Sequence, residues 1–162
     1  MLNKLMTEFN ELYAIEKLQP TRDNLLNVRD LITDEIDELS HELRLSDIDL
    51  YGVAAELTDV LYITAERMRA LGFDVDALLE EKHRSNLSKV LPAEMPNYEI
   101  MMELQVARER YPDALLEACD TGYVLRCDRT GKVIKPLCYS KAVITDSMIG
   151  IKEADTNKAY EG

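Results

Sequence analysis

Four acidic residues stand in two pairs with the same spacing. Glu35 and Glu38 are three residues apart, and so are Glu56 and Asp59. Because residues three apart lie on the same face of an α-helix, each pair presents two carboxylates side by side. Four converging carboxylates form a hard, anionic site that suits Mg²⁺ or Mn²⁺. The spacing therefore predicts a divalent-metal site with all four residues as ligands.

Two predicted helices position these carboxylates. The first covers residues 23 to 45, where apolar residues recur at steps of three or four, and it begins near Pro20 and Thr21. The second runs from about Leu50 to Leu71, after polar capping residues at 46 to 49, and Gly72 ends it. In an antiparallel hairpin each acidic pair would lie roughly two to three turns from the connection, so the two pairs can face each other.

Ordinary surface charge is the alternative explanation, since 31% of all residues are charged. Glu56 and Asp59 argue against it, because their helix is apolar over most of its circumference. An uncompensated carboxylate in such surroundings costs several kcal/mol. The same surplus of apolar surface predicts that this helix is central or lies at a subunit interface.

The rest of the chain predicts further helices and one β-hairpin. Residues 2 to 18 are expected to be helical, and Phe73 and Asp74 form a hydrophobic staple and N-cap for a third helix that carries residues 80 to 89. After Pro92 and Pro96 we expect a helix at 97 to 110 and a short helical stretch to Cys119. Residues 123 to 127 and 132 to 134 then flank a turn in which Gly131 takes a positive φ. A frayed polar tail is expected after about residue 145.

Composition excludes several classes of function. The formal net charge of −12 and the isoelectric point of about 4.6 disfavour binding to a nucleic-acid polymer, which needs clustered Lys and Arg. No apolar run approaches the roughly 18 to 20 residues that span a bilayer, so we expect a cytoplasmic protein without a membrane partner. Three cysteines, without a C-x-x-C pair, indicate reduced thiols: Cys119, Cys127 and Cys138.

Three segments resemble the MazG, dimeric dUTPase and phosphoribosyl-ATP pyrophosphohydrolase superfamily. Residues 31 to 39 and 55 to 62 are similar to its E-x-x-E and E-x-x-D motifs. Residues 83 to 89 resemble the N-x-x-K segment of its phage and phosphoribosyl-ATP-pyrophosphohydrolase-like members, and residues 128 to 136 resemble the D-x-x-G-K-V-x-K tail of the phage group. The chain departs from MazG proper by having Asp34-Glu35 where adjacent glutamates are usual, and by an apparent insertion at residues 91 to 119.

The resemblance implies an all-α, MazG-like helical bundle completed by dimerisation, with a small C-terminal β-hairpin. It divides the chain into a catalytic core at 1–90, a helical insertion at 91–119, and a hairpin and tail of the same domain at 120–162. Relatives are dimers or dimers of dimers. We expect a homotetramer, because the insertion offers a second contact.

The resemblance also implies hydrolysis between the α and β phosphates of a nucleoside triphosphate, giving a monophosphate and pyrophosphate. Two or more Mg²⁺ or Mn²⁺ ions would neutralise the triphosphate and activate a water molecule, which Glu35 or Glu38 orients or deprotonates. Predicted phosphate-binding residues are Lys82, Asn86, Lys89, Lys132 and Lys135, the first three aligned along one helix.

Substrate identity stays open at this level. Closeness to phage sequences suggests nucleotide-pool remodelling in a host cytoplasm, with dGTP or GTP as the first candidate. Hydrolysis of dUTP or of phosphoribosyl-ATP is the alternative reaction. A further alternative is an acidic helical interaction module that has no turnover.

Overall fold

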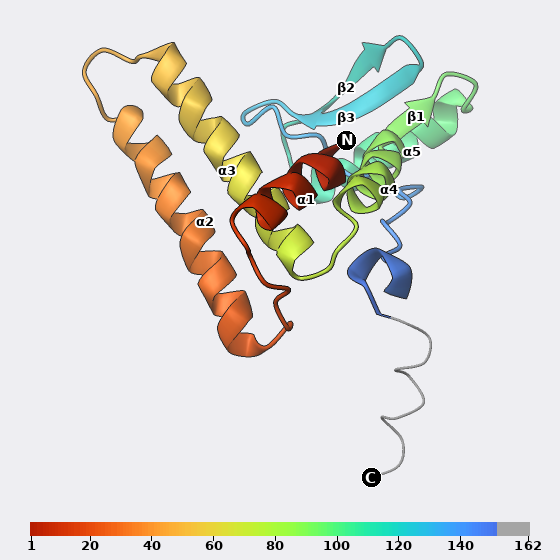
Figure 1. The fold of residues 1–162 in the computed structure, drawn as a ribbon. Helices are drawn as coiled ribbons and strands as arrows, with labels where there is room; N and C mark the ends of the chain where they lie inside the picture. The colour runs from red at the N-terminus through yellow and green to blue at the C-terminus, as the bar shows by residue number, and fades with distance from the viewer. Residues whose placement is uncertain (152–162) are drawn as a thin grey trace. The chain divides into compact units, whose positions relative to one another are not determined.

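A computed structural model describes residues 1–151 and shows a mostly helical chain with a small antiparallel sheet (Figure 1). The described part contains five α-helices: α1 (Leu2–Leu12), α2 (Arg22–Glu42), α3 (Leu50–Ala70), α4 (Val75–Leu87) and α5 (Asn97–Arg110). Its strands are β1 (Val90–Pro92), β2 (Ala114–Cys119) and β3 (Gly122–Cys127), and a short 3-10 helix η1 covers Asp146–Ile149. The predicted fold class is confirmed, whereas its completion by dimerisation stays a prediction.

By its internal contacts the chain divides into two compact units. The first holds Met1–Leu78 together with the segment that starts at Ile144, and the second holds Leu79–Val143. The predicted division of the chain at residues 90 and 119 was based on sequence motifs and not on contacts between residues, so it stays a prediction.

In the first unit, α2 and α3 lie side by side as an antiparallel hairpin, drawn in orange and yellow in Figure 1. Capping residues fix where each helix begins. The Thr21 hydroxyl accepts a hydrogen bond from the Asn24 N–H (3.3 Å), and Asp49 accepts one from the Tyr51 N–H (2.9 Å). Gly72, at φ +86°, follows the end of α3. The predicted starts of both helices and the predicted end of α3 are therefore confirmed, whereas α2 ends at Glu42 and not at residue 45.

A small hydrophobic core lies between α1 and the C-terminal half of α3. Met6, Ala65 and Val75 are buried, and Leu2, Tyr62 and Met68 pack against them. Asp74 caps α4 as predicted, since its carboxylate accepts hydrogen bonds from the Ala77 N–H (2.9 Å) and from the Asn3 amide (2.7 Å). The Ala77 hydrogen bond is the main reason that the pKa of Asp74 lies below its usual value. The buried apolar residues of this unit thus lie around α1, the C-terminal half of α3 and the start of α4.

The second unit has its own core between α5 and the sheet. Strand order is β1-β3-β2, and all pairs are antiparallel, with Leu91 opposite Tyr123 and Leu116 opposite Leu125. From α5, Ile100, Leu104 and Ala107 follow helical spacing and pack on buried residues of the sheet and of the chain that follows it: Leu91, Ala114, Leu125, Cys127 and Ile134.

Several predicted elements are corrected. The first helix ends at Leu12, not at residue 18, and α4 ends at Leu87, before Lys89. Residues 114 to 119 form strand β2 instead of a helical stretch. The turn at 128 to 131 exists, with Gly131 at φ +67°, but residues 132 to 134 pair with β3 only through one bridge between Arg126 and Val133.

A frayed tail was expected after about residue 145, but Asp146–Ile149 form the short helix η1. The part of this prediction beyond Ile151 lies outside the described residues. All three cysteines are free. In the described residues, no helix combines the length and the apolar character needed to cross a bilayer.

Candidate functional site

Three of the four predicted metal ligands come together between α2 and α3. Glu35 and Glu38 from α2 and Glu56 from α3 each offer a carboxylate oxygen, and these oxygens lie within 4.8 Å of one another. The helical spacing places both α2 glutamates on the side that faces α3, as the sequence predicts. The hairpin therefore brings together a cluster of carboxylate oxygens from residues that are 21 positions apart at most.

Glu56 supplies a test of whether these residues fit a cation. Its Oε2 atom is buried and has no hydrogen-bond partner among the described residues. A buried carboxylate oxygen without a donor is costly, because it has lost its hydration and gained no partner. A divalent cation would satisfy this oxygen and the neighbouring ones, and hard cations prefer oxygen ligands. The donor set thus fits Mg²⁺ or Mn²⁺.

The raised pKa values of Glu35 and Glu56 also favour a bound cation. Burial, and then the charges of Glu38, Asp59, Glu56 and Asp34, raise the pKa of Glu35 above its ordinary value. Burial, and then Glu38, Asp59 and Glu42, raise the pKa of Glu56. Carboxylates that repel one another in partly buried positions disfavour their own ionisation. A bound cation removes this repulsion.

Asp59 lies beside the close cluster and not within it. Its side chain is exposed, yet its charge raises the pKa of both Glu35 and Glu56. Aspartate is one methylene shorter than glutamate, which limits its reach toward the other oxygens. Its role as a ligand stays a prediction.

Sequence reasoning missed Glu42, whose charge also raises the pKa of Glu56. Glu42 follows Glu38 by four residues, so helical spacing alone places it on the same face. Gly52 makes room for it, because a Cβ at that position would stand 2.7 Å from Glu42 Oε2. A glycine opposite a third glutamate was the available signal.

Glu66, further along α3, is a buried carboxylate that has partners within the protein. It is fully buried and forms an ion pair with Arg67. The amide of Asn10, in the orientation that satisfies both groups, donates to Glu66 Oε1 (2.8 Å). Glu66 thus has protein partners for its charge, whereas Glu56 Oε2 has none in the described chain.

The predicted phosphate-binding residues all lie in the second unit, but not on one helix. Lys82 and Asn86 are exposed on α4, whereas Lys89 lies in the turn after it. The predicted alignment of all three along one helix is therefore wrong, because α4 stops at Leu87. Lys89 instead lines one pocket of about 640 Å³ together with Lys132 and Lys135.

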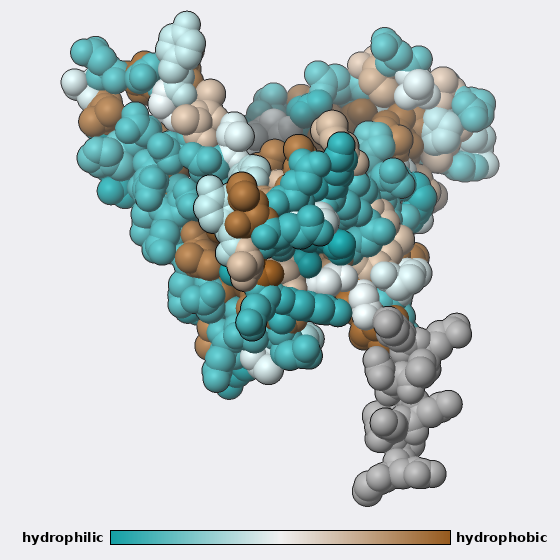
Figure 2. Space-filling view, viewed as in Figure 1, coloured by the Kyte–Doolittle hydropathy of each residue, from teal (hydrophilic) through white to brown (hydrophobic). Residues whose placement is uncertain are grey.

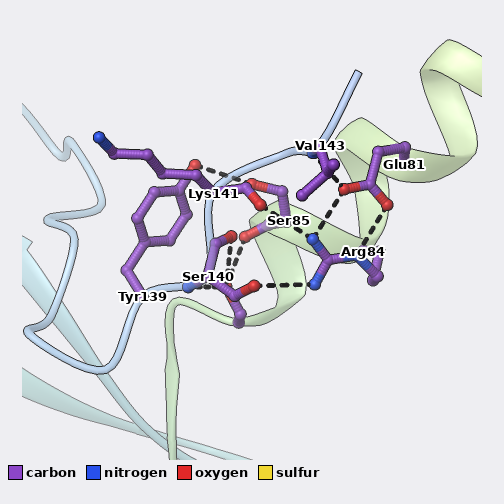
Figure 3. Close-up of polar contacts among 8 residues, drawn as sticks. Glu81, Arg84, Ser85, Tyr139, Ser140, Lys141 and Val143 are labelled. Atoms are coloured by element: carbon purple, nitrogen blue, oxygen red, sulfur yellow. Dashed lines mark hydrogen bonds and ion pairs between the residues drawn. The ribbon is translucent and has the colours of Figure 1, made fainter. Parts of the chain in front are cut away.

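A polar network holds the segment after Lys135 against α4 (Figure 3). The buried Ser85 hydroxyl lies 2.7 Å from the Tyr139 hydroxyl. Arg84 donates hydrogen bonds to Glu81, to the Ser140 hydroxyl (3.0 Å) and to the Lys141 carbonyl (2.9 Å). Glu81 also accepts a hydrogen bond from the Val143 N–H (2.7 Å). The hydrogen bond with Ser85, and then the charges of Lys135, Lys82 and Lys89, lower the pKa of Tyr139.

Comparison with known proteins adds a family to this geometry. The family model described as phosphoribosyl-ATP pyrophosphohydrolase matches residues 2–86, just over half of the chain. A search of curated proteins finds no match. The matched segment contains the α2–α3 hairpin and all four predicted metal-binding carboxylates. The chain therefore belongs to the phosphoribosyl-ATP pyrophosphohydrolase family, a group of nucleotide pyrophosphohydrolases within the MazG-like all-α superfamily.

Proposed function

We propose that the protein is a metal-dependent nucleoside-triphosphate pyrophosphohydrolase, which converts a (d)NTP and water to a (d)NMP and pyrophosphate. One observation carries the proposal: three carboxylate oxygens from α2 and α3 converge within 4.8 Å, and Glu56 Oε2 is buried beside them without a partner. Such a cluster favours a hard divalent cation over a purely structural role.

Glu35, Glu38, Glu56 and Asp59 would hold the ion or ions. Bound Mg²⁺ or Mn²⁺ would offset the negative charge of the phosphates and lower the pKa of a water molecule. Glu35 or Glu38 orients or deprotonates the attacking water, which requires a carboxylate in its ionised form. Lys89, Lys132 and Lys135 bind phosphate groups through charge-assisted hydrogen bonds.

For the substrate, dGTP or GTP is our first proposal, with nucleotide-pool remodelling in a phage-infected host as the setting. Phosphoribosyl-ATP is the second candidate, because the matching family model carries that name. Deoxyuridine triphosphate is a third. All three share the α–β phosphoanhydride bond, so one assay compares them.

The test is a substrate panel with Mg²⁺, in which chromatography identifies the released products. We expect a monophosphate and intact pyrophosphate. A diphosphate and orthophosphate as primary products would mean attack at the γ phosphorus and would contradict the proposal. A non-catalytic module would show no turnover and no joint stabilisation by Mg²⁺ and nucleotide in a thermal-shift experiment.

A further inference from the structure

Glu42 and Gly52 form the next facing pair of the α2–α3 hairpin beyond the acidic cluster. Glu42 follows Glu38 by four residues on α2, and Gly52 precedes Glu56 by four residues on α3. The structure places Glu42 against Gly52, because a Cβ on Gly52 would lie 2.7 Å from Glu42 Oε2. The register of the hairpin thus extends the row of carboxylates by one helical turn toward the connection between the helices.

The charge of Glu42 is not neutralised within the described chain. Glu42 is half-buried, and among residues 1–151 it forms no ion pair within 4.0 Å. A carboxylate in this position loses part of its hydration without gaining a compensating contact. On α3, one turn after Gly52, Glu56 Oε2 is buried and has no partner among the described residues either. Carboxylates on both helices therefore need a cation that residues 1–151 do not supply.

The glycine at position 52 allows the Glu42 carboxylate to lie close to α3. Gly52 stands in the first turn of α3, although glycine favours a helix less than alanine does. An alanine would fit only if Glu42 moved, since the new Cβ would also stand 3.3 Å from Glu42 Cδ. Gly52 therefore keeps the Glu42 carboxylate beside the turn of α3 that carries Glu56.

Glu42 lies too far along the hairpin to share one ion with the clustered glutamates. The oxygens of Glu35, Glu38 and Glu56 lie within 4.8 Å of one another, and Glu42 does not belong to this set. One turn of an α-helix rises about 5.4 Å, whereas the two ions of a two-metal site lie about 3.5–4 Å apart. An additional ion beside the first would therefore be close enough for Glu42 to bind.

We propose that Glu42 is a fifth carboxylate of the metal centre and binds an additional Mg²⁺ or Mn²⁺ ion next to the ion of the three clustered glutamates. Hard cations of this kind take oxygen ligands and retain water molecules, so one further carboxylate is a sufficient anchor. Glu56 carries two oxygens one turn from Gly52 and contacts both ions. The inference rests on the metal site of the proposed function, and it holds for any of the candidate substrates.

Counting bound Mn²⁺ on the full chain, without nucleotide, tests the proposal. Electron paramagnetic resonance measures free Mn²⁺ during a titration, at a physiological ionic strength that screens diffuse binding to surface charge. We expect two ions per chain in the wild type. Glu42→Gln should weaken binding of the second ion at least about ten-fold and leave the first ion bound. A single bound ion in the wild type, or two unchanged ions in Glu42→Gln, would overturn the proposal.

Two further variants separate metal binding from net charge and from helix stability. Asp37→Asn removes one charge from an exposed residue of α2 that helical spacing turns away from α3, so it should bind Mn²⁺ like the wild type. In Gly52→Ala the new Cβ should displace the Glu42 carboxylate and weaken binding of the second Mn²⁺ as Glu42→Gln does. Its melting temperature in EDTA should stay unchanged or rise, because alanine favours a helix. Wild-type affinity for both ions in Gly52→Ala would overturn the role assigned to Gly52.

The Mn²⁺ titration and the hydrolysis assay separate this inference from the proposed function. If the wild type hydrolyses a nucleotide with Mg²⁺ but Glu42→Gln binds Mn²⁺ like the wild type, only the role of Glu42 fails. If Glu42→Gln loses the second ion but the wild type hydrolyses no nucleotide, only the proposed function fails.

Discussion

At Glu56 the requirements of folding and of metal binding oppose each other. Its Oε2 atom is buried without a partner, and burial and neighbouring carboxylates raise its pKa. An acid whose pKa rises on folding destabilises the folded state when it is ionised. This penalty is absent below the ordinary value of 4.5 and grows as the pH rises through the higher folded value. A glutamate at such a position is better explained by ligand binding than by stability.

The first prediction is that Glu56→Gln raises the melting temperature of the metal-free protein at pH 8. The neutral amide removes the repulsion with Glu38 and Asp59, so the gain should shrink as the pH falls toward 4.5. Thermal melts in EDTA at pH 8 and pH 5 measure it, with exposed Glu16→Gln as the control. Added Mg²⁺ should stabilise the wild type and not the variant. A lower melting temperature for Glu56→Gln at pH 8 would contradict the electrostatic argument.

A second prediction concerns Glu38→Gln and Asp59→Asn. Each neutral amide keeps the size of the side chain and loses the charge that holds the cation. Activity with Mg²⁺ should therefore fall at least about 100-fold, a loss of about 2.7 kcal/mol or more in transition-state stabilisation. Circular dichroism should show an unchanged helical content. Asp37→Asn, on the same helix and exposed, is the matched control. Near-normal release of monophosphate by Glu38→Gln or Asp59→Asn would contradict the proposed metal site.

The acidic cluster was predictable because helical spacing is a local property. Glu35, Glu38 and Glu56 follow from the sequence, since two regular helices joined by a short connection leave few arrangements open. Glu42 stands at helical spacing from Glu38 and was missed, whereas its close approach to Gly52 depends on the register between the two helices. The pocket of Lys89, Lys132 and Lys135 depends on tertiary packing between segments more than 40 residues apart, which spacing does not encode.

At the level of elements, the α2–α3 hairpin depends on where α3 begins. Asp49 accepts a hydrogen bond from the Tyr51 N–H (2.9 Å) and satisfies a free donor of the first turn. The third prediction is that Asp49→Ala lowers the free energy of unfolding by about 1 kcal/mol, or roughly 2–4 °C in melting temperature for a chain of this size. Asp47→Ala, in the same connection, should have little effect. Equal losses in the two variants would argue against a cap at Asp49.

Helices with a clear start signal and a regular apolar period were predicted well, and strand β2 was not. The helix at 97 to 110 matches α5, since proline precedes it and its apolar residues keep a helical period. Residues 114 to 118 are Ala, Leu, Leu, Glu and Ala, which favour a helix intrinsically. Pairing with β3 along its whole length overrides that preference. Local propensity is weak beside such a ladder, so a single sequence gives the wrong element here.

For the molecule as a whole, apolar surface remains uncovered on the α2–α3 hairpin. No residue of α2 is buried in the described chain, and on α3 Leu57 and Leu61 are 54% and 55% exposed. Figure 2 shows hydrophilic residues over much of the visible face, with hydrophobic patches between them. Burying one exposed leucine contributes about 1.5–3 kcal/mol. Large side chains at helical spacing on a hairpin thus favour packing against another helical surface.

The fourth prediction is that a second copy of the chain supplies this surface. Packing α2 and α3 against the same helices of a partner would complete a four-helix bundle, an isologous arrangement that gives a symmetric dimer. A second contact through residues 91 to 119 would then give the tetramer that we expect. Leu57→Glu or Leu61→Glu should dissociate the assembly and lower the melting temperature, because a carboxylate would be buried without a partner.

Light scattering at micromolar concentration, combined with thermal melts, measures both effects. Leu12→Glu is the matched control, since Leu12 is 78% exposed at the end of α1 and lies outside the hairpin. The control should keep the mass and the melting temperature of the wild type. Dilution should lower the melting temperature of the wild type but not that of a dissociated variant, because association stabilises the fold by mass action. A compact, active wild-type monomer of 18.5 kDa would contradict the shared bundle and leave the exposed leucines of α3 for a different partner.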